Sequence, residues 1–118
     1  MRISRETTEL ISWLHSKPFI LALVRETQES LLNKAAVPVL RIFLPRWTAH
    51  FLAYRRLLEL RQTLEIIATQ EENRPDDKKL IIKGKPEVKE HAQKMMKLVQ
   101  NPVFWFSIAR LVSFLQRV

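Results

Sequence analysis

An Arg-Trp pair, Arg46 and Trp47, is the part of this sequence best suited to binding a ligand. A guanidinium group binds phosphate oxygens and a flat indole stacks on an unpaired base, so the pair suits a nucleic acid. Further basic side chains lie on both sides of the pair. We therefore predict a nucleic-acid-binding site composed of Arg41, Arg46, Trp47, His50, Arg55 and Arg56.

The same residues also suit the start of a buried helix. Phe51 and Tyr54 alternate with the basic residues, and aromatic side chains at helical spacing belong more often to a core than to a binding surface. We expect both to be core residues. For Arg46 and Trp47, a structural role and DNA binding stay equally open. Free backbone N–H groups at a helix start beside Arg46 would add to the attraction for an anion.

The sequence contains no recognisable catalytic or metal-binding motif. Cys is absent, which excludes thiol nucleophiles and Cys-based zinc sites. The three histidines are far apart, at His15, His50 and His91, and we expect them to be solvated or to cap helices. Asp76 and Asp77 are followed by two lysines and are predicted to lie in a solvated loop. We expect the chain not to be an enzyme and to bind no cofactor, metal or small-molecule substrate.

The net charge is +8 and the pI is near 10.3, a balance that favours polyanionic partners. Basic residues are spread along the chain, and no apolar run reaches the ~18–20 residues that span a bilayer, so we expect the partner to be a nucleic acid and not a membrane. Interfacial membrane binding is a third and weaker hypothesis. The lysines between Lys78 and Lys97 would add affinity for phosphates without reading a base sequence.

Apolar residues at three- and four-residue spacing predict the helices that position these side chains. A first helix is expected over 3–14 and a second, started by a proline, over 18–32. Residues 33–45 are rich in β-branched side chains and contain two prolines, which predicts an extended connector or a short edge strand. Residues 46–70 contain no Gly or Pro and predict one long helix.

The long predicted helix has an apolar face and a charged face. Four-residue spacing predicts ion pairs between Arg55 and Glu59 and between Arg61 and Glu65 on the charged face. The expected core face carries Trp47, Phe51, Tyr54, Leu57, Leu58, Leu64 and Ile67 or Ala68.

The remaining sequence predicts a polar loop over 71–85, a helix from Pro86, and a last helix capped by Asn101. The last helix is apolar on most sides and is expected to be buried on several faces. Trp105 and the neighbouring Phe104 and Phe106 are expected in the core, or on a surface that a missing partner covers. We predict an all-α fold of about five helices in an irregular bundle. Residues 1–118 would form a single helical domain or part of one, cut from a larger protein.

Three blocks of the sequence together resemble hAT-type DNA transposases: residues 13–18, 44–61 and 101–105. That family typically has a Thr-Arg-Trp motif, a helix of pattern Leu-Leu-Glu-Leu-Arg and a later Asn-x-x-Phe-Trp-like motif. Here Arg46 and Trp47 match the first motif, although Pro45 replaces the usual Thr. The match covers most of the chain at the level of pattern.

The resemblance implies a parent transposase with an RNase H-like core, in which two Asp and one Glu hold divalent metal. A helical domain is inserted into that core, and this chain is similar to part of the insertion. It contains no counterpart of the acidic triad or of the family's Cys-x-x-His motif. The resemblance thus implies a non-catalytic, nuclear, DNA-binding fragment that contacts transposon-end or hairpin DNA. By position, Arg46 and Trp47 would support flipped-out bases.

A protein-interaction module without nucleic-acid binding is the alternative function. The apolar last helix and its cluster Phe104, Trp105 and Phe106 would dock a partner protein or a second copy of the chain.

Overall fold

Prolines and apolar stripes determine where the helices begin and which faces they bury. In the computed structural model, which describes residues 2–32 and 47–116, the described chain contains six α-helices, one 3₁₀ helix and no strand. The predicted all-α class is confirmed, with one helix more than expected. The elements are α1 (Arg2–His15), α2 (Pro18–Ser30), α3 (Trp47–Glu59), α4 (Arg61–Asn73), η1 (Asp76–Lys78), α5 (Pro86–Val99) and α6 (Pro102–Gln116).

Three of the helices begin at a proline, as the sequence predicted. Pro18, Pro86 and Pro102 open α2, α5 and α6. Proline is well suited to the first helical turn, because the N–H that it lacks would have no partner there. Asn101 caps α6, since its side-chain Oδ1 accepts a hydrogen bond of 3.0 Å from the N–H of Val103.

The prediction of one helix over 46–70 is wrong, because the chain bends at Leu60 and separates α3 from α4. The Leu60 side chain is fully buried, and its backbone turns through φ −91° and ψ −1°. Its N–H donates to the carbonyls of Arg56 and Leu57, so the bend keeps its hydrogen bonds. The bend allows α3 to pack chiefly on α6 while α4 packs on α2 and α5.

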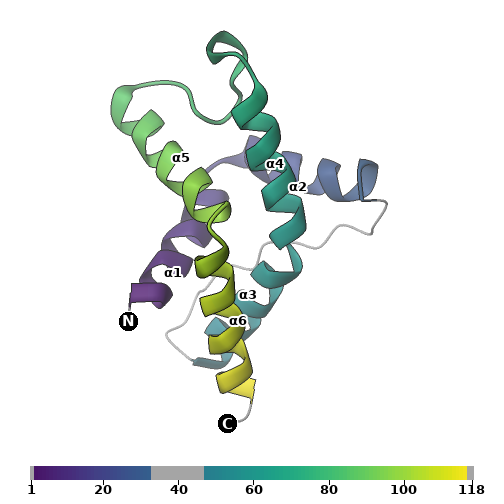
Figure 1. Ribbon diagram of the computed structural model, residues 1–118, viewed down its shortest axis with the longest axis vertical. Coiled ribbons are helices and arrows are strands. Elements are labelled where there is room, and N and C mark those ends of the chain that lie inside the picture. The colour runs from purple at the N-terminus through teal and green to yellow at the C-terminus, as the bar shows by residue number, and fades with distance from the viewer. Residues whose placement is uncertain (1, 33–46, 117–118) are drawn as a thin grey trace.

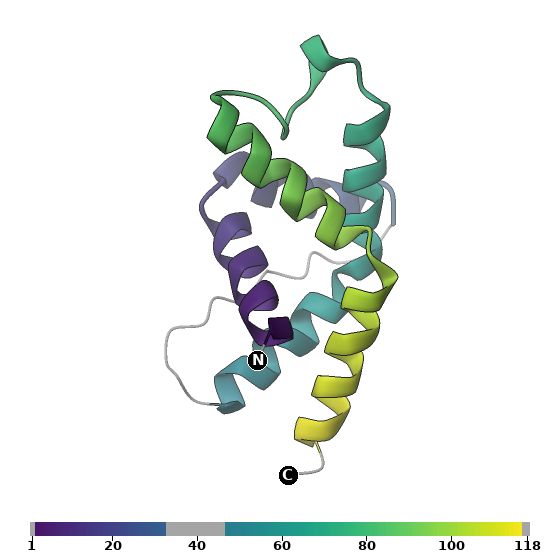
Figure 2. The same cartoon turned by 60° about the vertical axis from the view of Figure 1, so that its left-hand side comes forward.

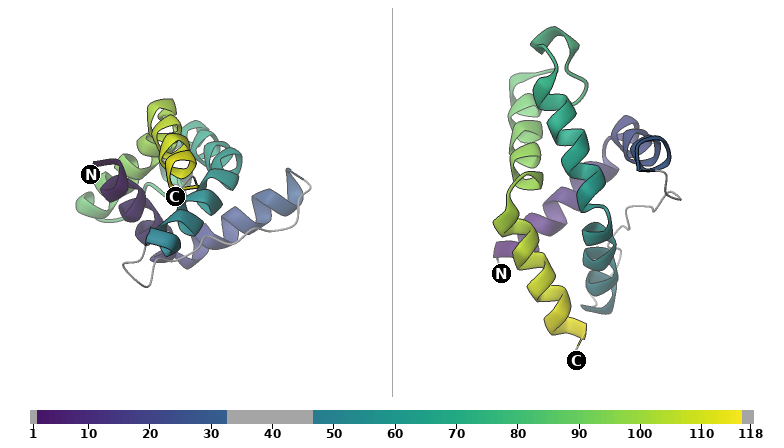
Figure 3. Two further views of the ribbon diagram at one scale, coloured as in Figure 1. Left: turned by 90° about the horizontal axis from the view of Figure 1, so that it is seen from below. Right: turned by 45° about the vertical axis from the view of Figure 1, so that its right-hand side comes forward.

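The helices form two roughly parallel columns along the 48 Å axis of the molecule (Figure 1). One column consists of α4 followed by α3, and the other of α5 followed by α6. The right-hand panel of Figure 3 shows the two columns side by side, with α2 lying outside them. Helix α1 lies beside α5 and α6 (Figure 2). The sequence-distant helices α3 and α6 therefore meet at one end of the molecule.

The core lies between the columns and beneath α1 and α2. Its largest fully buried side chains are Trp105 and Tyr54. The indole N–H of Trp105 donates a hydrogen bond of 2.6 Å to the carbonyl of Val99, at the end of α5. This bond fixes the angle between α5 and α6 and satisfies the one polar atom that the indole carries into the core.

The prediction that the last helix is buried on several faces is wrong. Phe104, Trp105 and Ile108 are buried, but Val103 and Phe106 are exposed. The neighbours of α6 are α1, α3 and α5, and they cover one side of it.

The connecting segments differ in part from the predictions. Helix α4 continues to Asn73, three residues into the predicted 71–85 loop, and the short helix η1 follows Pro75. The prediction of a connector or edge strand over 33–45 falls outside the described residues.

Candidate nucleic-acid interface

The six predicted DNA-binding residues fall into three groups in the structure. Arg41 and Arg46 lie outside the described residues. Trp47 is the first residue of α3 and His50 lies in the first turn, but their side chains are not among those described. The side chain of Arg55 is exposed and that of Arg56 is half-buried. The structure thus places four of the six residues on one helix.

Arg56 has a nearby carboxylate partner. Its Nε lies 3.5 Å from Oε2 of Glu59, where the sequence predicted that Glu59 pairs with Arg55. Three-residue spacing also brings two side chains together on a helix, so either arginine suits Glu59. The second predicted pair is confirmed, because Nε of Arg61 lies 3.3 Å from Oε2 of Glu65.

The aromatic residues of α3 after Trp47 belong to the core, as predicted. Tyr54 is 1% exposed, and Phe51 is half-buried against the core. Stacking on a base therefore cannot come from Tyr54. Among the aromatic residues of α3, Trp47 is left as the candidate for stacking.

Acidic residues are missing from a long part of the sequence around α3. Residues 30–58 include no Asp or Glu but five Lys or Arg, namely Lys34, Arg41, Arg46, Arg55 and Arg56. Residues 91–118 also include no Asp or Glu. Because α3 and α6 pack together, they bring Arg55, Arg56 and Arg110 to one end of the molecule, with Glu59 as the only carboxylate of the two helices.

The backbone of α3 adds to this positive field. The helix begins at Trp47, directly after Arg46, and the N–H groups of a first turn have no partner within their helix. Such N–H groups and the helix dipole attract anions, phosphate included.

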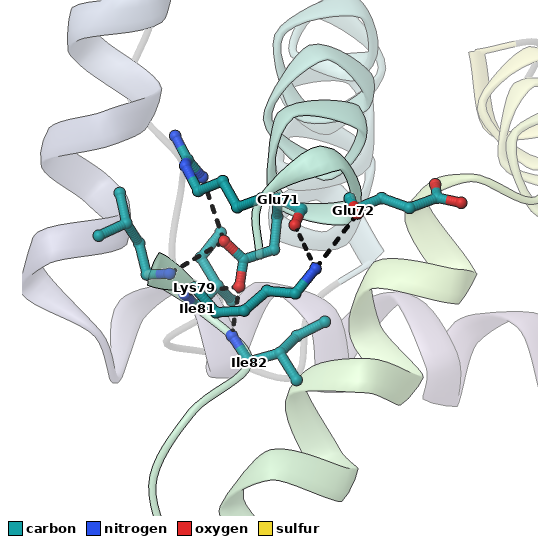
Figure 4. Close-up of polar contacts among 7 residues, drawn as sticks. Glu71, Glu72, Lys79, Ile81 and Ile82 are labelled. Atoms are coloured by element: carbon teal, nitrogen blue, oxygen red, sulfur yellow. Dashed lines mark hydrogen bonds and ion pairs between the residues drawn. The ribbon is translucent and has the colours of Figure 1, made fainter. Parts of the chain in front are cut away.

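At the other end of the molecule, a buried carboxylate that the sequence analysis missed organises the connection between α4 and α5. Glu71 is fully buried and accepts hydrogen bonds from three successive backbone N–H groups (Figure 4). The donors are Leu80 at 3.0 Å, Ile81 at 2.9 Å and Ile82 at 2.6 Å. The guanidinium of Arg74 completes the set at 3.1 Å. The signal in the sequence was the apolar segment 80–82, whose burial requires partners for its N–H groups.

The pKa of the Glu71 carboxyl group is lowered. Burial alone raises it, because a low-dielectric environment disfavours the charged form. The backbone N–H groups of Ile82, Leu80 and Ile81, together with the side chain of Arg74, stabilise the charge by more than burial costs. Glu71 is therefore a structural anion whose hydrogen-bonding capacity is used within the fold.

Several lysines of the 78–97 stretch also have structural partners. The ammonium group of Lys79 donates to the carbonyls of Glu71 and Glu72 at the end of α4 (Figure 4). Lys94 pairs with Glu9 at 3.0 Å and joins α5 to α1. Lys83 lies 5.8 Å from the ring centre of Phe19. These contacts weaken the case for the stretch as a phosphate-binding surface.

The histidines with described side chains do not belong to a metal-binding group. His91 is exposed, and its Nε2 lies 3.7 Å from Oε1 of Glu9. His15 differs from the expectation of a solvated residue, because its Nε2 is buried without a hydrogen-bond partner. Across residues 2–32 and 47–116, no group of three or more His, Asp or Glu side chains could hold a metal ion.

In the described part of the chain, no helix has both the length and the apolar character needed to cross a membrane. Compared with known protein families, curated proteins and solved structures, the chain matches none of them.

Proposed function

We propose that this chain is a non-catalytic DNA-binding region, of the helical kind inserted in hAT-type transposases, that contacts transposon-end or hairpin DNA. The observation that carries the proposal is the packing of α3 on α6, because α3 up to Leu58 and all of α6 lie in stretches of the sequence, 30–58 and 91–118, that contain no Asp or Glu. The motif resemblance around Arg46 and Trp47 supports the choice of DNA. A nuclear location is part of the proposal.

In this proposal, arginines hold the phosphates and Trp47 holds a base. Arg41, Arg46, Arg55 and Arg56 supply charge along the DNA backbone, and the first turn of α3 supplies N–H donors. The indole of Trp47 stacks on an unpaired base of a hairpin. The chain contributes neither metal nor catalytic groups, so cutting and joining of strands would belong to the divalent-metal core of a parent enzyme.

A fluorescence titration with labelled hairpin DNA tests the site. We expect the double variant Arg46→Ala/Trp47→Ala to bind at least tenfold more weakly than wild type, because one phosphate contact and one stacked base are lost. The matched control is Lys85→Ala, an exposed cation before α5 on the far side of the molecule, which should change the affinity by less than about threefold. Equal affinity of the double variant and wild type would overturn the assignment of Arg46 and Trp47.

Self-association through α6 is a second candidate function. The observation that favours it is the exposed apolar side of α6, at Val103, Phe106 and Phe114. Sedimentation at several protein concentrations distinguishes the candidates, since a monomer that binds DNA contradicts self-association and a stable dimer without DNA affinity contradicts DNA binding.

A further inference from the structure

Helix α6 has a second apolar face, directed away from the core. Val103, Phe106 and Phe114 are 68%, 63% and 65% exposed. The buried residues of the helix, which include Trp105 and Ile108, lie on the opposite side. At roughly 100° per residue, positions 103, 106, 110 and 114 fall within an arc of about 80°. The exposed residues therefore form one continuous strip, which we call the outer strip.

A single arginine lies between the two phenylalanines of the outer strip. Arg110 is four residues from each of them, and its guanidinium carbon lies 5.9 Å from the ring centre of Phe106. At 1.5 Å per residue, Phe106 and Phe114 are about 12 Å apart along the helix. That distance covers between three and four stacked nucleotides at roughly 3.4 Å each.

The charge around the outer strip indicates which kind of ligand it could bind. No Asp or Glu occurs between His91 and Val118, and the neighbouring α3 has none before Glu59. Helix α1 also packs on α6 and carries Glu6 and Glu9, of which Glu9 pairs with Lys94. An apolar strip with an arginine between two phenylalanines suits an anion that carries flat apolar groups. Single-stranded DNA has this chemistry, because its phosphates are negative and its unpaired bases have exposed π-faces.

We propose that the outer strip is a stacking platform for single-stranded DNA, with one base on Phe106, another on Phe114 and a phosphate on Arg110. The inference rests on the proposed DNA binding and adds a second contact surface, on a different helix from Trp47. In this proposal, α6 binds the unpaired strand next to a DNA hairpin.

A second copy of the chain suits the outer strip less well. In an antiparallel pair of α6 helices that places Phe106 against Phe114, position 110 meets position 110. The two arginines would then face each other without a carboxylate on either helix. Like charges at such a position oppose association.

The test compares variants in which the side chains stay large and apolar or aromatic but differ in whether they have a ring that can stack on a base. Labelled oligo-dT and a duplex of equal strand length are titrated with wild-type protein and with two double variants. Phe106→Leu/Phe114→Leu keeps apolar area but removes the rings, and Phe106→Tyr/Phe114→Tyr keeps the rings. Phe19→Leu, the same change at an exposed phenylalanine of α2 outside the strip, is the matched control. All the altered side chains are exposed, and circular dichroism verifies that each variant is folded.

We expect the Phe106→Leu/Phe114→Leu variant to bind oligo-dT about tenfold or more weakly, and the Tyr variant and Phe19→Leu to stay within about threefold of wild type. Duplex binding should change little in all variants. If the Leu variant keeps wild-type affinity for oligo-dT while the duplex binds, the stacking platform is wrong and the proposed function stands. If no DNA binds, both fail. Equal losses in the Leu and Tyr variants together with dimer dissociation would identify a protein interface instead.

Discussion

At the scale of single residues, Glu71 shows how one buried charge can determine the path of a loop. Its carboxylate receives four hydrogen bonds from residues three to eleven positions later in the chain. Without this acceptor, the N–H groups of the apolar segment 80–82 would need other partners, at a cost of about 1–3 kcal/mol for each buried group left unsatisfied. The carboxylate thus lets an apolar segment reach the core from a polar connection.

Replacing Glu71 by Gln should lower the free energy of unfolding by about 2–4 kcal/mol at neutral pH, because the amide keeps one acceptor oxygen and sets an N–H₂ group against N–H donors. Since the pKa of Glu71 is lowered in the folded state, its stabilising contribution is full above the ordinary value of 4.5 and is lost as the pH falls through the folded value. Urea denaturation at several pH values measures the effect.

The matched control for this prediction is Glu72→Gln, on the exposed neighbouring side chain. It should change the free energy of unfolding by less than about 0.5 kcal/mol. A difference between wild type and Glu71→Gln that stays constant from neutral to acidic pH would contradict the role of the charge.

At the scale of elements, the bend at Leu60 divides one apolar sequence pattern between two packing partners. The side chain of Leu60 is buried where α3 and α4 meet, and the next residue, Arg61, lies 5.8 Å from the ring centre of Trp105. The bend therefore lies close to the joint between α5 and α6, which Trp105 holds. The bend between α3 and α4 and the joint between α5 and α6 therefore lie side by side.

Leu60→Ala should destabilise the fold by about 2–5 kcal/mol, because the lost methyl groups leave a cavity that its buried neighbours fill only in part. Alanine has the higher helix propensity, so the loss would reflect packing and not local helix stability. Thermal or urea unfolding provides the measurement, with the exposed Leu52→Ala on the same column as control. Equal effects of the two substitutions would show that the bend is no packing centre.

How far the sequence determines these elements depends on the range of the interactions. The helix starts at Pro18, Pro86 and Pro102 could be predicted because their causes are local. No Gly or Pro near Leu60 indicates the bend in the sequence, and the bend depends on the helices packed around it. For the same reason, the apolar segment 80–82 indicated that its N–H groups need partners but not that Glu71 is the partner, and the sequence could not indicate that Phe106 is exposed.

The sequence could predict which residues belong to the candidate site but not which other helix lies beside them. The sequence identified Tyr54 as a core residue, which is confirmed, and it identified Arg55 and Arg56 as candidate contacts, which stays a prediction. It did not connect α3 with α6, because residues more than forty positions apart meet only after folding. That contact is what joins two acid-free stretches into one end of the molecule.

At the scale of the whole molecule, carboxylates are distributed unevenly along the long axis. Helices α3 and α6 carry a single carboxylate, Glu59, whereas the connection between α4 and α5, at the other end (Figures 1 and 3), contains Asp76 and Asp77. That connection also contains five Lys or Arg between Arg74 and Lys85, so both ends are net positive. Both ends would attract a polyanion, and the α3–α6 end differs in having fewer carboxylates that repel it.

Hairpin-DNA affinity should fall steeply with salt. If Arg41, Arg46, Arg55 and Arg56 each neutralise a phosphate, the logarithm of the binding constant should fall with the logarithm of salt concentration with a slope of about −3. Arg55→Gln should make the slope shallower by about one, while Lys85→Gln should leave it unchanged. Titrations at four or more salt concentrations measure it, and a slope near zero would contradict phosphate binding.

The hydrogen bonds of Glu71 also affect how the backbone exchanges its amide protons with solvent. Amides in a polar loop ordinarily exchange fast, because water reaches them without any unfolding. The N–H groups of Leu80, Ile81 and Ile82 are instead bonded to a carboxylate on the last turn of α4. These amide protons can exchange only when the Glu71 side chain releases its hydrogen bonds. The three residues should therefore exchange as slowly as the last turn of α4, although they are separated from that helix in the sequence.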